Sequence, residues 1–164
     1  MKKILITLLV VVLAVASIGA QSVDSISKAS TVNYYTKTSI SGEDLWKALE
    51  SYQLSVSIAT VNADGSPNAA VVIPGVTADR QHLYFGLAAN QTGINMKERK
   101  LIVLTATGYT PPKGDQKMSY TGARIIAEYV SDPELQKKLV EQNKDKKATA
   151  NTYFLKIVKV LPIG

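Results

Sequence analysis

Six stretches of the chain carry the hydrophobic pattern of β-strands. Residues 54–61 (LSVSIATV) alternate apolar and polar positions and place Leu54, Val56 and Ile58 on one face, which is typical of a half-buried strand. The polar turn Asp64-Gly65-Ser66-Pro67 follows and interrupts strand pairing. Five more apolar stretches rich in β-branched residues are expected to be strands: 68–74, 82–88, 101–108, 122–130 and 152–162. Among them, LIVLTATG is apolar almost throughout and predicts a central strand covered on both faces.

Helical spacing is limited to three short segments. The first helix is expected after Ser41, which precedes an acidic residue at the spacing of a capping box, and Trp46 is interpreted as its core anchor. A short helix is expected at 95–99, and Asp132 followed by Pro133 favours the start of a third. Consecutive antiparallel strands with few helices predict a mainly β fold, a six-stranded barrel with helices at its rim.

The first residues have the layout of a secretory leader. Two lysines precede an apolar run from Ile4 to Ile18, and small and polar residues follow it. We expect a signal peptide at 1–22, a Ser/Thr-rich linker at 23–40 and one domain at 41–164, exported to the periplasm or secreted. The apolar run is at the short edge of a membrane span, about 17 residues. An uncleaved N-terminal membrane anchor is therefore the alternative interpretation.

The composition excludes several kinds of site. The chain has no Cys and one His, which excludes disulfides, thiol chemistry and an ordinary zinc site, so no metal is expected. A Ser-His-Asp hydrolase would have to use His82, and no G-x-S-x-G motif accompanies it. Loss of the two leader lysines lowers the formal net charge of +6 by two. The remaining positive charge is spread out, so nucleic-acid binding is not expected.

One segment, LAANQTGINMKERK at 87–100, has the composition of a ligand-binding loop. A strand ends in Ala88-Ala89, whose small side chains allow a planar or phosphorylated ligand to approach the backbone. Polar residues and a helical turn follow, and free amides at a helix start are suited to a phosphate. An ordinary strand-to-helix loop with a polar cap explains the same pattern. No residue is identified as catalytic, so a cofactor would have to carry any reaction.

Three stretches together resemble a known family: IATVNADGSPNAAVV, LYFGLAANQTGINMKERKLIVLT and YTGARIIAEYVSDPEL. Their motifs and order are similar to those of the flavin-binding split-barrel superfamily, which includes pyridoxamine 5′-phosphate oxidase and small FMN-binding proteins. The resemblance covers residues 42–162. It implies a six-stranded antiparallel split barrel that forms a homodimer and binds FMN between its two subunits.

The resemblance also implies which residues hold the flavin. Val71 and Val72 would lie against the isoalloxazine ring. The phosphate and the ribityl chain would be surrounded by the residues at the end of the third strand and the start of the next helix, namely Ala88, Ala89, Gln91, Thr92 and Asn95. The implied activity is flavin-dependent electron transfer or reduction of a small substrate, as in an FMN-dependent oxidoreductase.

Two departures from the family pattern leave alternatives open. Gln91 stands where many relatives have Lys or Arg beside the Thr, and a charged donor binds phosphate more strongly than a neutral one. The Arg-bearing C-terminal segment of true pyridoxamine phosphate oxidases is missing, so vitamin B6 oxidation is not expected. One alternative is a flavin-free split barrel that serves as a binding or scaffold dimer. The other is a heme-binding variant in which His82 is the candidate ligand.

Overall fold

The computed structural model describes residues 38–163 of the chain. The predicted signal peptide at 1–22, and all but the last three residues of the predicted linker at 23–40, lie outside the described residues. The described elements, in chain order, are α3 (Gly42–Glu50), β1 (Ser55–Val61), β2 (Pro67–Val72), β3 (Gly75–Val76), β4 (His82–Gly86), α4 (Gln91–Arg99), β5 (Leu101–Thr110), β6 (Ser119–Tyr129), α5 (Pro133–Gln142) and β7 (Thr152–Leu161). None of the helices in this range is long and apolar enough to cross a membrane.

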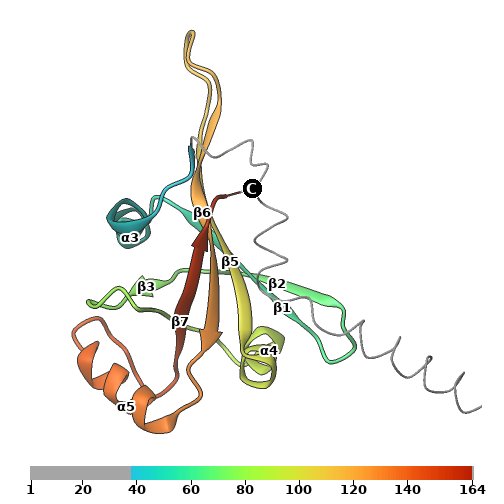
Figure 1. Cartoon of the computed structure of the whole chain (residues 1–164), viewed down its shortest axis with the longest axis vertical. Helices are drawn as coiled ribbons and strands as arrows, with labels where there is room; N and C mark the ends of the chain where they lie inside the picture. Colours follow the sequence, from blue (N-terminus) through green and yellow to red (C-terminus); the bar gives the residue numbers. More distant parts are fainter. Residues whose placement is uncertain (1–37, 164) are drawn as a thin grey trace, which may run out of the picture. The chain divides into compact units, whose positions relative to one another are not determined.

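The strands form one curled antiparallel sheet, a half-barrel, in the order β2-β1-β5-β6-β7-β4-β3 (Figure 1). The predicted mainly β fold with helices at its rim is confirmed, but the sheet has seven strands and the prediction of six is wrong. The additional strand is β3, whose Gly75 and Val76 pair with Tyr84 and Leu83 of β4. A strand of two residues is too short to show an alternating pattern, and polar residues follow it directly.

The hairpin between β5 and β6 is longer than predicted. Its strands extend to Thr110 and back from Ser119, so both ends of the expected loop at 108–120 are paired. Tyr109 faces Tyr120 across the hairpin, with ring centroids 5.3 Å apart. The Pro and Gly content of this segment favours a loop, yet cross-strand aromatic pairs stabilise a ladder. The loop interpretation was therefore wrong at both ends of the segment.

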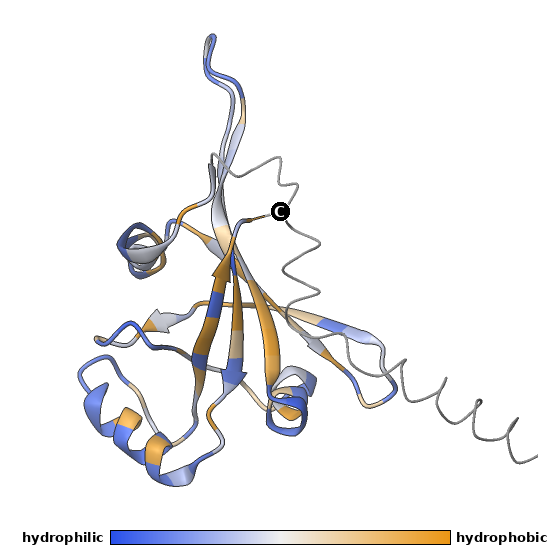
Figure 2. Cartoon of the chain, viewed as in Figure 1, coloured by the Kyte–Doolittle hydropathy of each residue, from blue (hydrophilic) through white to orange (hydrophobic). Residues whose placement is uncertain are grey.

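The core is filled by buried residues of the sheet and of helices α3 and α4, and along β1 and β5 these residues alternate with less buried neighbours. Along β1, Val56 and Ile58 are buried and their neighbours are exposed, as the alternation predicted. Strand β5 is central, between β1 and β6, and the middle strands are apolar along most of their length (Figure 2). The second face of β5 is only half-buried, so the prediction that both faces are covered holds for one face. Trp46 of α3 is 8% exposed, which confirms it as a core residue.

The start of the described domain has one local feature that differs from the prediction and one that holds it to the sheet. Ser41 is the N-cap residue of α3, but its side chain makes no capping hydrogen bond, so the predicted capping box is not formed. The Ile40 amide donates to the carbonyl oxygen of Gly122 at 2.9 Å. Gly122 has a φ of +150°, and a Cβ at this position would collide with the carbonyl oxygen of Ala106. Only glycine therefore allows β6 to approach β5 this closely.

Candidate functional site

The predicted ligand-binding segment forms the end of β4 and the start of α4. Helix α4 begins at Gln91, four residues earlier than the helix expected at 95–99. Asn90 is its N-cap, and its side chain accepts a hydrogen bond from the Gly93 amide at 3.0 Å. The segment therefore has the polar helix cap that the alternative interpretation of the sequence required.

Helix α4 is tied to strands β1 and β2 by neutral polar side chains. We call this set the amide–hydroxyl network, and it consists of Thr60, Asn62, Asn68, Gln91, Thr92 and Asn95. Asn95 donates from Nδ2 to Thr60 Oγ1 at 3.1 Å and to Asn62 Oδ1 at 2.8 Å. Asn68 donates from Nδ2 to Thr60 Oγ1 and to Thr92 Oγ1, both at 2.9 Å. The two amides thus bridge two strands and one helix.

The centre of this network is buried. Asn95 is 1% exposed, Thr92 3% and Thr60 5%. Every polar atom of the Asn95 side chain has a partner, because its Oδ1 accepts from Gln91 Nε2 at 2.8 Å. Buried polar groups are costly unless they are paired, so these bonds hold α4 in one position on the sheet. Thr92 and Asn95 belong to the first turns of α4, and their side chains face the interior. Contact of these two side chains with a ligand stays a prediction.

The other predicted site residues differ in how far they are exposed to solvent. Val71 of the edge strand β2 is 75% exposed, whereas Val72 is 5% exposed and belongs to the core. Successive strand residues face opposite sides of a sheet, so only Val71 can offer its side chain to a planar ring. Ala88, Ala89 and Gln91 are exposed. None of the seven predicted residues carries a charge.

Sequence reasoning missed Thr60, Asn62 and Asn68, which complete the network. A signal for Asn68 was available, since the alternation of β2 places it on the same inward face as Ala70 and Val72. A polar residue on an apolar face requires a buried partner. The partner itself, Thr92, is 24 residues further along the chain and shares no local pattern with it.

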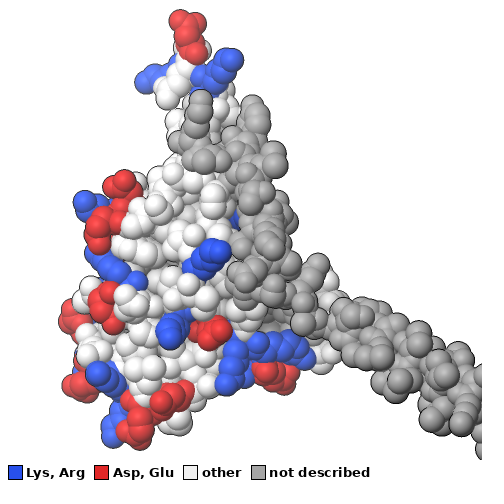
Figure 3. Space-filling model, viewed as in Figure 1, with Lys and Arg blue, Asp and Glu red and all other residues white. Residues whose placement is uncertain are grey.

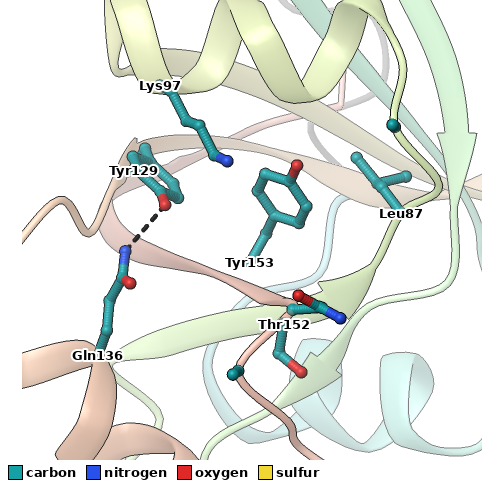
Figure 4. A pocket seen from close by; sticks show the side chains of 9 residues that line it. Leu87, Lys97, Tyr129, Gln136, Thr152 and Tyr153 are labelled. Carbon is teal, nitrogen blue, oxygen red and sulfur yellow. Dashed lines mark hydrogen bonds between the residues drawn. The ribbon is translucent and has the colours of Figure 1, made fainter. Parts of the chain in front are cut away.

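Sequence reasoning also missed a second candidate site on another side of α4. We call it the Lys97 cavity, a space of about 410 Å³ that opens between α4, the start of β7 and the start of α5 (Figure 4). Its lining residues are Leu87, Ala89, Lys97, Tyr129, Gln136, Ala150, Asn151, Thr152 and Tyr153. The Lys97 ammonium lies 5.4 Å from the centroid of the Tyr153 ring. Gln136 Nε2 donates to the Tyr129 hydroxyl at 2.8 Å.

The Tyr153 ring is fixed by its neighbours. It stacks on Phe85 with centroids 6.4 Å apart and an interplanar angle of 15°, and it meets the Tyr129 ring at 6.0 Å. A Cβ at Gly93 would lie 2.5 Å from the Tyr153 hydroxyl, so glycine is required for α4 to rest on this ring. The sequence predicted neither the stacking of Tyr153 on Phe85 nor its contact with Tyr129, because the three aromatic residues lie on different strands.

His82, the candidate heme ligand, is the first residue of β4 and is 8% exposed. Its Nδ1 lies 3.9 Å from Asp79 Oδ1. Burial lowers the pKa of His82, and this effect outweighs the opposite influence of the Asp79 carboxylate. His82 does not line the Lys97 cavity. The structure therefore gives no support to this residue as an axial ligand, because it places the imidazole inside the fold.

This chain is similar to known proteins in its fold and not in its sequence. No protein-family model matches the chain, and no curated protein matches its sequence. An FMN-binding protein from Syntrophomonas wolfei subsp. wolfei is 21% identical, with a TM-score of 0.50, over 74% of this chain and 85% of that one. HupZ of Group A Streptococcus is 15% identical, with a TM-score of 0.51, over 76% of this chain and 100% of that one.

The chain has the split-barrel fold of these solved structures. The structural likeness confirms the fold that the sequence resemblance implied. The half-barrel sheet is shared with both solved structures, while identities of 15% and 21% leave the ligand of this chain open. The split barrel places the end of β4, the start of α4 and the edge strand β2 in one region, which contains the predicted flavin residues.

The network predicts that Asn95→Leu is strongly destabilising. The leucine side chain has a similar volume but leaves the half-buried Asn62 Oδ1 without its donor and removes one of the two amide donors to the buried Thr60 Oγ1. We expect the free energy of unfolding in urea to fall by about 2 kcal/mol. The matched control is Gln91→Ala, which removes the donor to Asn95 Oδ1 at the exposed end of the network, where water can replace it, and should cost less than about 1 kcal/mol. Equal losses in the two variants would contradict the anchoring role of Asn95.

The buried His82 predicts a specific dependence of stability on pH. The unfolded chain takes up the His82 proton near pH 6.5, and the folded chain takes it up only at lower pH, because its pKa is lowered by burial. Between these two values the unfolded chain binds more protons, so the free energy of unfolding falls as the pH falls. Urea unfolding from about pH 7.5 to about pH 5 should show this slope. His82→Gln should flatten it, since the chain has no other histidine; an unchanged slope would refute the assignment.

Proposed function

We propose that this domain binds FMN between two copies of the chain and uses it for electron transfer or for the reduction of a small substrate. The observation that carries the proposal is the split-barrel fold, shared with the FMN-binding protein from Syntrophomonas wolfei. The N-terminal sequence pattern supports a location outside the cytoplasm, in the periplasm or secreted. The proposed enzyme class is an FMN-dependent oxidoreductase whose redox chemistry belongs to the flavin.

The ring end of a flavin has suitable neighbours on β2. Val71 and Ile73 are 75% and 73% exposed, on and just after an edge strand. Exposed apolar side chains at a sheet edge are favourable contacts for a planar apolar ring or for a second subunit. On the outer face, Val71 is paired with Ser57, and Ala59 with Ala69, so this surface is small and uncharged. These residues support both the ring contact and the proposed homodimer.

The phosphate end has neutral donors only. At the start of α4, the Gly93 and Ile94 amides already donate to Asn90, to its side chain and its carbonyl oxygen respectively. Among the hydrogen bonds of the described residues, the Gln91 and Thr92 amides have no acceptor and remain for a phosphate, together with the exposed Gln91 side chain. Phosphate fits this helix start, where the helix dipole favours an anion. It would be held without a charge-assisted bond.

The chain's own residues would bind and orient the cofactor. A bound flavin supplies the capacity to accept and return electrons. Val71 would exclude water from one side of the ring, and Ala88 and Ala89 would let the ligand approach the backbone. Gln91 and two backbone amides would orient the phosphate. No side chain of the proposed site is assigned a proton-transfer role, because none of the seven residues is titratable.

A flavin-free binding dimer is the second candidate function. The observation that favours it is the closed amide–hydroxyl network, in which Asn95 uses every polar atom of its side chain within the protein. A scaffold needs only the exposed surface of β1 and β2. Flavin binding decides between the two candidates.

Titration of the full chain with FMN and with riboflavin tests the proposed function. Flavin fluorescence should be quenched by both ligands, and the affinity for FMN should exceed that for riboflavin by less than about tenfold, because the phosphate meets only neutral donors. Gln91→Lys should raise the preference for FMN about tenfold by adding a charge-assisted bond. Gln142→Lys, which adds the same charge on α5, is the matched control. Indifference to both flavins at micromolar concentration would refute the proposal and favour the scaffold dimer.

A further inference from the structure

Lys97 presents an unpaired positive charge to the cavity named after it. Its neighbour Arg99 pairs with Glu98 at 2.8 Å, whereas no carboxylate within residues 38–163 lies in ion-pair distance of Lys97. The other residues that line the cavity are uncharged, so Lys97 is its sole formal charge. The ammonium is held above the Tyr153 ring, 5.4 Å from the centroid, by a cation–π contact. The cavity therefore has a net positive character.

A second donor points to the same space. The Tyr129 hydroxyl oxygen accepts a hydrogen bond from Gln136, so its own proton is available to another acceptor. Gln136 Nε2 also donates to the carbonyl oxygen of Val130, and both of its hydrogens are thus used within the protein. Gln136 orients the Tyr129 hydroxyl in this way. Figure 4 shows the Lys97 and Tyr129 side chains converging on the cavity from α4 and from the end of β6.

The floor of the cavity is apolar and rigid. Tyr153 is stacked on Phe85 and is in contact with Tyr129, and the absence of a Cβ at Gly93 lets the ring lie against α4. Leu87 lines the cavity beside it. A preformed aromatic surface next to a cation is suited to a planar or apolar molecule that carries an anionic group. A volume of about 410 Å³ has room for a small molecule of this kind.

This cavity is separate from the proposed flavin phosphate site. Gly93 and Lys97 are four residues apart and lie on one side of α4, toward Tyr153 of β7. Thr92 and Asn95 lie on the neighbouring side, toward β1 and β2. Ala89 is the one residue that belongs to both. The two sites are formed by different side chains and differ in their chemistry.

We propose that the Lys97 cavity is a binding site for a small organic anion. A carboxylate or phosphate group receives donors from the Lys97 ammonium and the Tyr129 hydroxyl. The planar or apolar body of the ligand lies against Tyr153 and Leu87. The site is independent of flavin, and it is present in a single copy of the chain.

Titrations of the full chain with benzoate and with phenyl phosphate test this proposal. Binding is followed by nuclear magnetic resonance of ¹³C-labelled tyrosine rings, with the Tyr129 and Tyr153 signals assigned from Tyr→Phe variants. Both signals should shift, whereas benzamide and benzylamine, which lack the negative charge, should move them far less. Inorganic phosphate alone separates recognition of the anionic group from recognition of the body. A phenyl phosphate preference over benzoate would identify phosphate as the favoured group, and the reverse would identify carboxylate.

Charge variants make the test specific to Lys97. Lys97→Met should weaken binding by about tenfold or more, and Lys97→Arg should keep it within about threefold, because a cation donor is retained. Lys117→Met removes the same charge on the distant hairpin between β5 and β6 and should leave binding unchanged. Unshifted Tyr129 and Tyr153 signals at millimolar benzoate and phenyl phosphate would overturn the proposal. Equal affinity in Lys97→Met would also overturn it.

Discussion

The amide–hydroxyl network is the constraint on which the rest of the site depends. Asn68 and Asn95 each use both hydrogens of one amide group to join a strand to another strand or to α4. Because Thr60, Thr92 and Asn95 are almost fully buried, a shift of the helix would leave several polar atoms unpaired in the interior. The network therefore sets where α4 starts and how it is rotated about its axis.

Because the network fixes the rotation of α4, two sides of the helix have different surroundings. The side that bears Thr92 and Asn95 is bonded to β1 and β2, and the helix start above it offers amides to a ligand. The side that bears Gly93 and Lys97 rests on Tyr153 and borders a cavity with a net positive charge. The two proposed sites differ in electrostatics for this reason. The start of α4 has only neutral donors, while the charge of Lys97 lies six residues further along the helix. Charged side chains of both signs are interspersed over the face drawn in Figure 3.

The sequence predicted those features that arise from local patterns. The alternation in 54–61, the turn before Pro67 and the cap of α5 at Asp132 all depend on neighbouring residues, and the structure has each of them. The strand β3 was missed because two residues carry no period. The Asn68–Thr92 bond and the Lys97 cavity could not be predicted, because they depend on how α4 packs on distant strands. The burial of Val72, Thr92 and Asn95, three of the residues predicted to contact a flavin, depends on the same packing.

The most direct test of the account is the position of a bound flavin. With methyl-labelled valine and alanine and ¹³C-labelled tyrosine in the full chain, intermolecular nuclear Overhauser effects to the protons of the isoalloxazine ring of FMN report which residues lie next to it. We expect contacts with the Val71 methyl groups and with Ala88 or Ala89, and none with Tyr129. Contacts with Tyr129 and Tyr153 in place of Val71 would contradict it, because the flavin would then occupy the Lys97 cavity.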